Sequence, residues 1–134
     1  MKQFAIAALA AALSLPLLCP DCSAAGGEPG WEACDEQESR HEVRECQRKV
    51  IGYWDKRLNA AYQKVRKNCE TAQCPKKLQE AERAWITYRD LMIEAAGEAV
   101  GGYEAKGTMI EAREQTTYLA TKHQALVLEK LLEE

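Results

Sequence analysis

Histidine is scarce in this chain of 134 residues, which has only two, His41 and His123. They are far apart in the sequence, and neither belongs to a cluster of a nucleophile and a base. The acidic residues Asp55, Glu82 and Asp90 show no catalytic spacing either. The sequence therefore argues against an enzyme, including a small hydrolase.

Strand patterns and long apolar stretches are also lacking. No window alternates apolar and polar residues for long enough to predict a β-strand. The one long apolar run, residues 4–18, has about 15 residues, whereas a membrane-spanning helix needs roughly 20. The net charge is −3, and the basic part of the chain contains compensating acids, so nucleic-acid binding is not indicated.

The first 25 residues are typical of a secretory signal peptide. Lys2 supplies the positive start, the apolar run follows, and Ser23 and Ala25 stand at the small-residue positions of a cleavage site. Residues 1–25 are therefore predicted to be removed, leaving a protein that is periplasmic or secreted.

Cys19 allows two other interpretations of this leader. It could carry a lipid anchor, but Leu18 before it is larger than the side chain that lipidation sites prefer. With Cys22 it also forms a redox-type CxxC motif, which needs a preceding strand and a following helix that a leader does not provide. No lipid anchor, redox cofactor or other cofactor is predicted.

The remaining chain divides into an arm and one helical domain. Residues 26–38 are rich in glycine, proline and acids, which predicts a flexible acidic arm with little regular structure. Residues 39–134 show helical periodicity in three stretches. They are predicted to form a single all-α domain, a three-helix up-down-up antiparallel bundle that begins with a long helical hairpin.

The first predicted helix covers residues 40–67. It opens with the capping box Ser39-x-x-Glu42, in which each side chain satisfies a backbone N–H group of the other residue. Its apolar residues recur at steps of three and four, as in a helix with one buried face. They are Val43, Cys46, Val50, Trp54, Leu58, Ala61 and Val65.

Two further helices follow. Pro75 suits the first turn of the second, and Gly101 ends it. Its predicted seam is Leu78, Ala81, Trp85, Tyr88, Met92, Ala95 and Ala99. A second capping box, Thr108-x-x-Glu111, is predicted to open the third helix. The predicted buried stripe of that helix is Met109, Ala112, Thr116, Leu119, His123, Leu126 and Lys130 or Leu131.

Four cysteines follow the leader, and an even number in an exported protein predicts disulfides. Cys46 and Cys69 lie near opposite ends of the first helix, about 35 Å apart at a rise of about 1.5 Å per residue. They cannot bond, because a disulfide requires Cα atoms within about 7 Å, and the same argument excludes pairing Cys34 with Cys69 and Cys46 with Cys74. The remaining pairing is Cys34–Cys46 and Cys69–Cys74. A zinc site shared with either histidine would need distant ends to meet, so no metal is predicted.

Polar and aromatic residues of the first two helices fall level with one another when counted outward from the turn. Trp85 is then near Leu58, and Arg89 is near Asp55. A guanidinium beside a carboxylate and aromatic rings would lock the two helices together. Asn59 is expected to satisfy a neighbouring polar group such as the Trp85 indole N–H.

These residues form two motifs in a fixed order, Asp55-x-x-Leu58-Asn59-x-x-Tyr62 and Arg83-Ala84-Trp85-x-x-Tyr88-Arg89-Asp90. Together with the early cysteines Cys34 and Cys46, they resemble the LprI-type lysozyme inhibitor family of small exported bacterial helical domains. The resemblance covers residues 34–127, roughly. It implies a protein that binds lysozyme and protects the cell envelope.

The chain departs from the family pattern at three places. Glu82 stands where the family usually has glutamine, and Ile93 where it often has a cysteine. The cysteine on the third helix that would pair with it is also missing. The Cys69–Cys74 pair would therefore supply a disulfide at a different place.

Charge is unevenly distributed along the chain. Residues 26–47 carry seven acids and two bases, residues 48–90 eleven bases and five acids, and residues 91–134 four bases and eight acids. Common lysozymes are strongly basic, with catalytic carboxylates in the cleft, and an acidic surface would steer such a partner. The expected binding residues are Glu32, Asp35, Glu36 and Glu38. The alternative is that these are solvated faces of a periplasmic interaction or structural module that does not contact lysozyme.

Overall fold

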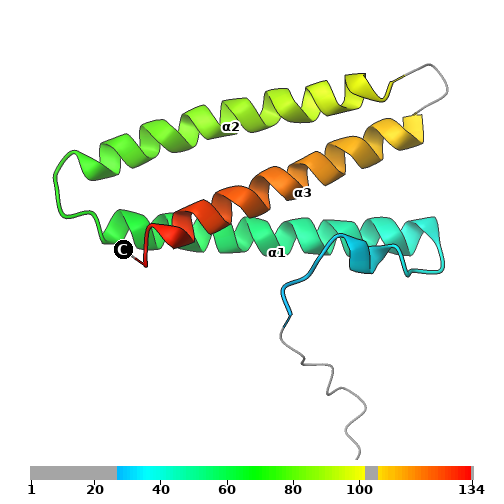
Figure 1. Ribbon diagram of the computed structural model, residues 1–134, viewed down its shortest axis with the longest axis horizontal. Helices are drawn as coiled ribbons and strands as arrows, with labels where there is room; N and C mark the ends of the chain where they lie inside the picture. Colours follow the sequence, from blue (N-terminus) through cyan, green and yellow to red (C-terminus); the bar gives the residue numbers. More distant parts are fainter. Residues whose placement is uncertain (1–26, 102–105, 134) are drawn as a thin grey trace, which may run out of the picture.

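The computed structural model describes residues 27–101 and 106–133 of the chain. They form a short 3-10 helix, η1 (Glu32–Cys34), and three long helices, α1 (Arg40–Lys67), α2 (Cys74–Ala99) and α3 (Lys106–Lys130) (Figure 1). These two ranges contain no strand, and the helices run up, down and up. The predicted all-α class is confirmed. The predicted leader lies outside the described residues.

The start of α1 is the predicted capping box. The Glu42 backbone N–H donates to the Ser39 hydroxyl oxygen at 3.2 Å, and the Ser39 N–H donates to the Glu42 carboxylate at 3.0 Å. Both are groups that a helix end otherwise leaves without partners. The apolar face of α1 is also as predicted, because Val50, Trp54, Leu58 and Ala61 are all buried.

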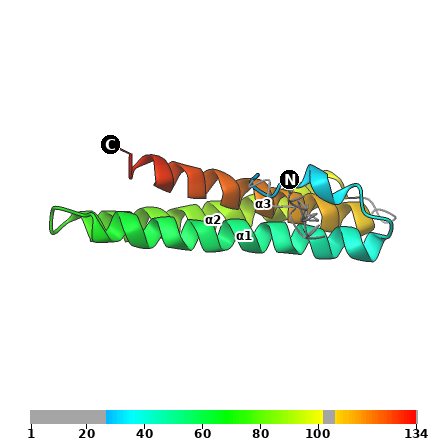
Figure 2. The ribbon, with the colours of Figure 1, turned by 90° about the horizontal axis from the view of Figure 1, so that it is seen from below.

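α3 is the central helix of the domain. It packs along both α1 and α2, whereas α1 and α2 make few contacts with each other. Figure 1 shows α3 crossing between them, and in Figure 2, seen from below, α1 and α2 overlap while the C-terminal half of α3 lies to one side of both. The disulfide Cys69–Cys74 closes the turn that joins α1 to α2. Among the described residues, no helix is both apolar enough and long enough to cross a membrane.

The predicted lock between α1 and α2 is not present. Arg89 forms an ion pair with its neighbour Asp90 at 2.7 Å, and its guanidinium lies over the ring of Trp85 on the same helix. Asn59 donates to the backbone oxygen of Asp55 at 2.8 Å, one turn earlier on α1. Each polar group finds its partner on its own helix, because α3 and not α1 is the main neighbour of α2.

The predicted buried stripe of α3 is also wrong. Leu119 and Leu131 are more than half exposed, and His123 is exposed. The residues that are buried instead are Tyr118, Thr121, Ala125 and Leu128. Apolar side chains lie on more than one side of α3. Two different sets of residues therefore show helical steps of three and four, and the sequence does not decide which set is buried. The predicted second capping box fails as well, because α3 begins at Lys106 and Thr108 lies inside it.

Only part of the predicted seam of α2 is buried. Leu78 and Trp85 pack against the core, as predicted. Tyr88 remains 58% exposed and Met92 remains 42% exposed. The face that turns inward at the far end of the helix contains Gly97, which the seam did not include.

The core joins α1 and α3 to the segment before α1. Trp31 and Cys34 of that segment are buried, and the Trp31 ring stacks on Tyr118 of α3 with the ring centroids 5.5 Å apart. The predicted disulfide Cys34–Cys46 connects the same segment to α1. The arm thus has little regular structure, but it is packed against both helices.

Candidate binding surface

The acidic arm is held in place by contacts at its beginning as well as by its disulfide. The indole N–H of Trp54, whose side chain is fully buried, donates to the backbone oxygen of Pro29 at 3.1 Å. Glu28 forms an ion pair with Arg57 of α1. Together with the stacking of Trp31, these contacts fix the position of the arm across α1 and α3.

Arg57 is the centre of this anchor. Its Nε and Nη2 atoms donate to the two carboxylate oxygens of Glu129 on α3, at 2.6 Å and 2.7 Å. Its guanidinium also lies over the Trp54 ring, 4.7 Å from the centroid, and Lys122 lies over the same ring. Hydrogen bonding from Arg57 lowers the pKa of Glu129, while bonding to Glu129 and then Glu28 raises the pKa of Arg57. The cluster therefore joins the arm, α1 and α3 electrostatically.

The four carboxylates expected to bind a partner lie together on this anchored segment. Glu32, Asp35, Glu36 and Glu38 are all exposed, and none forms an ion pair with another described residue. Backbone hydrogen bonds from Asp35 to Glu32 and from Gln37 to Cys34 hold the turn that carries them. Four negative charges are consequently gathered within seven residues, and no described residue forms an ion pair with any of them.

A pocket of about 550 Å³ lies between the arm and α1. Its polar lining includes Gln37 of the arm and Glu42 and Glu45 of α1, and Cys46 and Val50 contribute apolar surface. These two glutamates extend the acidic surface beyond the four predicted residues. Glu42 and Glu45 are three residues apart in α1 and so share one face, and this spacing is the sequence signal that could have identified them.

One lysine moderates the charge of this pocket. Lys49 forms an ion pair with Glu45 at 3.1 Å, one turn along α1. The hydrogen bond from Lys49, followed by its positive charge, lowers the pKa of Glu45. Both side chains are well exposed, so the pair can separate at little cost when a competing cation approaches.

The residues of the two sequence motifs are not part of this surface. Leu58 is in the core, and Tyr62 and Trp85 pack against it. The polar members make their contacts within their own helices, as described above, and Tyr88 and Arg83 are exposed. In the part of the chain that the structure describes, no group of three or more histidine, cysteine or acidic side chains is arranged to hold a metal ion.

Comparisons with known proteins identify one family. The model of the family described as lysozyme inhibitor LprI matches residues 32–128, from η1 through almost all of α3, including both disulfides. No curated protein matched the chain, and no solved structure matched it.

Proposed function

Because the chain belongs to the LprI lysozyme inhibitor family, we propose that it binds lysozyme and thereby protects the bacterial cell wall from hydrolysis. The family consists of inhibitors and not of enzymes. Family membership and the two disulfides indicate an extracytoplasmic protein. We propose that residues 1–25 direct its export, so that it meets lysozyme in the periplasm or outside the cell.

The observation that carries the proposed mode of binding is the exposed group of unpaired carboxylates on the acidic arm. A strongly basic lysozyme is attracted to such a surface, and this attraction raises the rate of encounter. The disulfide Cys34–Cys46 and the buried Trp31 keep the arm folded before binding. Binding would therefore not have to order a free segment, which would cost affinity.

The pocket beneath the arm supports a more specific contact. Glu42 and Glu45 provide negative charge, and Cys46 and Val50 provide apolar surface. A lysine or arginine side chain of the partner has the matching form, with an apolar stem and a cationic end. We propose that one such side chain of lysozyme enters this pocket while the four arm carboxylates face the surrounding basic surface.

The test is an inhibition assay with the oxidised protein that begins at residue 26. It is mixed with several classes of lysozyme, and the clearing of cell-wall suspensions is followed. Inhibition of at least one class, rising with the molar ratio, is the expected result. If micromolar excess inhibits no class, the protein is a helical interaction or structural module that does not contact lysozyme.

A further inference from the structure

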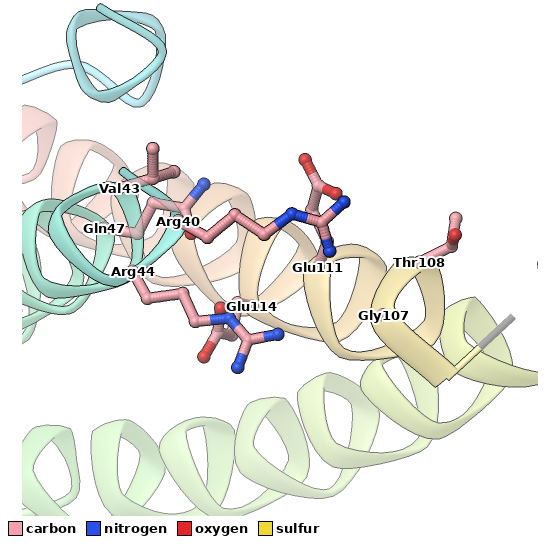
Figure 3. A pocket seen from close by; sticks show the side chains of 8 residues that line it. All are labelled: Arg40, Val43, Arg44, Gln47, Gly107, Thr108, Glu111 and Glu114. Carbon is pink, nitrogen blue, oxygen red and sulfur yellow. The ribbon is translucent and has the colours of Figure 1, made fainter. Parts of the chain in front are cut away.

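A second pocket, separate from the one beneath the acidic arm, lies between the first turns of α1 and α3. Its volume is about 450 Å³, within the usual range for small-molecule sites of roughly 300–1,000 Å³. Figure 3 shows the side chains that line it. Those that matter here are Arg40, Arg44 and Gln47 of α1, and Glu111 and Glu114 of α3.

The charges of this pocket are sorted by helix. Arg40 and Arg44 are one turn apart on α1, so their guanidinium groups share one face of that helix. Glu111 and Glu114 are likewise neighbours on one face of α3. The two arginines extend toward the side of α3 that carries the two glutamates (Figure 3). Positive groups from α1 and negative groups from α3 therefore face one another in this pocket.

These four charged groups, two positive and two negative, balance one another in sum. None of them forms an ion pair with any described residue, although such pairs occur at several other places on the helices. No described residue at ion-pair distance therefore competes with a ligand for their hydrogen-bonding groups.

Gln47 adds a neutral polar group to the pocket. Gln47 is only 2% exposed, and it lines the pocket. Its side-chain amide makes no hydrogen bond with another residue in ranges 27–101 and 106–133. Neither amide atom is among the fully buried atoms without a partner in the described residues, so the amide faces the pocket space, where it offers both a donor and an acceptor. A polar molecule in the pocket would satisfy it.

From these observations we infer that the pocket binds a zwitterionic amino acid or short peptide. The ligand carboxylate pairs with Arg40 and Arg44, and its ammonium group pairs with Glu111 and Glu114. A guanidinium binds a carboxylate through two parallel hydrogen bonds, which gives strength and direction. The Gln47 amide then bonds to a polar group between the two charged ends, such as a peptide bond. A simple anion or cation fits less well, because the two like charges from one of the helices would repel it.

The ligand test uses glycylglycine and two capped forms, with the full oxidised protein observed by NMR. Glycylglycine is expected to shift the Gln47 side-chain amide resonances in a saturable way. N-acetylglycylglycine lacks the ammonium group, and glycylglycine amide lacks the carboxylate, so each should bind about tenfold or more weakly. The affinities for glycine and triglycine are compared next. Tighter binding of glycine indicates an amino-acid site, and tighter binding of triglycine indicates a peptide site. Equal affinity for the three dipeptides, or no saturation of any probe up to about 10 mM, would overturn the inference.

Substitutions assign the two ends of the ligand. Arg44→Gln should reduce the preference for glycylglycine over its amide, because Arg40 alone remains, and Glu114→Gln should reduce the preference over the acetylated form, because Glu111 alone remains. The matched control is Arg48→Gln, one turn farther along α1 and outside the pocket, which should leave both preferences intact. Gln47→Leu should weaken all probes. If that variant does not fold, the two surface variants still decide, because unchanged preferences in both contradict the site.

Discussion

Replacing Glu129 by glutamine tests the anchor that joins the arm, α1 and α3. The variant loses the charge that accepts two hydrogen bonds from Arg57, at 2.6 Å and 2.7 Å. The two side chains are 26% and 29% exposed, so the pair is partly shielded from water. Glutamine fills the same volume and can still accept one hydrogen bond. The stability difference between the variant and the wild type therefore reports mainly the loss of the Glu129 negative charge.

The expected loss of stability follows from the geometry. A hydrogen bond to a charged group contributes about 1.5–3 kcal/mol, and glutamine keeps one of the two bonds, which the charged guanidinium still donates. The partial exposure of the pair reduces the loss. Arg57 also keeps its ion pair with Glu28. We therefore expect Glu129→Gln to lower the free energy of unfolding by about 1–2 kcal/mol at pH 7. In urea this corresponds to a midpoint about 0.5–1 M lower, for a slope of about 2 kcal/mol per M.

The loss must depend on pH in a particular direction. Arg57 lowers the pKa of Glu129 in the folded protein below its ordinary value of 4.5. A carboxylate of this kind stabilises the fold above its unfolded pKa, and the contribution disappears as the pH falls through the folded pKa. The difference between wild type and Glu129→Gln should therefore be constant from pH 7 down to about 5, and should shrink below 4.5.

The measurement is urea unfolding followed by the tryptophan fluorescence of Trp31, Trp54 and Trp85, at pH 7 and at pH 3. Glu133→Gln is the matched control, because Glu133 pairs with Lys130 on the exposed surface and should change stability by less than about 0.5 kcal/mol. A loss for Glu129→Gln no larger than for the control at pH 7 would refute the anchor. An equal loss at pH 3 and pH 7 would refute the electrostatic explanation.

Three further predictions concern the arm and the helices. Replacing the four arm carboxylates by lysine should slow association with a basic lysozyme severalfold. The effect should be larger at about 20 mM salt than at about 300 mM, where screening is strong. An unchanged association rate in stopped-flow measurements would contradict the steering role. Replacing Cys34 and Cys46 by serine should reduce the free energy of unfolding by about 3 kcal/mol and expose the arm to proteolysis, and an arm that stays protease-resistant would show that Trp31 suffices. Gly52→Ala should raise the free energy of unfolding by about 0.5–1 kcal/mol, because nothing lies near the added methyl group. Gly97→Ala should give no such gain, because the methyl group would collide with Arg113; calorimetry that found equal gains would contradict this packing.

The features that the sequence predicted correctly are those that nearby residues decide. The Ser39–Glu42 capping box, the apolar face of α1 and the two disulfides depend on spacing within one or two turns, or on a simple distance limit. The position of α3 depends on how three helices share their apolar faces. Spacing alone could not show that α3 would separate α1 from α2, so the lock between Arg89 and Asp55 was predicted and is absent.

The candidate surface was predicted in part for the same reason. The clustering of acids before α1 is visible as composition, and the structure places all four of those carboxylates on the exposed side of the arm. Glu42 and Glu45 were not included, because the fold of the arm over α1 creates the pocket that they line. That fold depends on Trp31, a single aromatic residue in a segment whose glycines and acids predict flexibility.

Binding of lysozyme is measured most directly by isothermal titration of the oxidised protein, starting at residue 26, into each class of lysozyme at about 150 mM salt. The proposed function predicts saturable binding to at least one class, with a dissociation constant below about 1 μM. It also predicts that the variant with four reversed arm charges binds that class more weakly. The absence of binding to every class would contradict it.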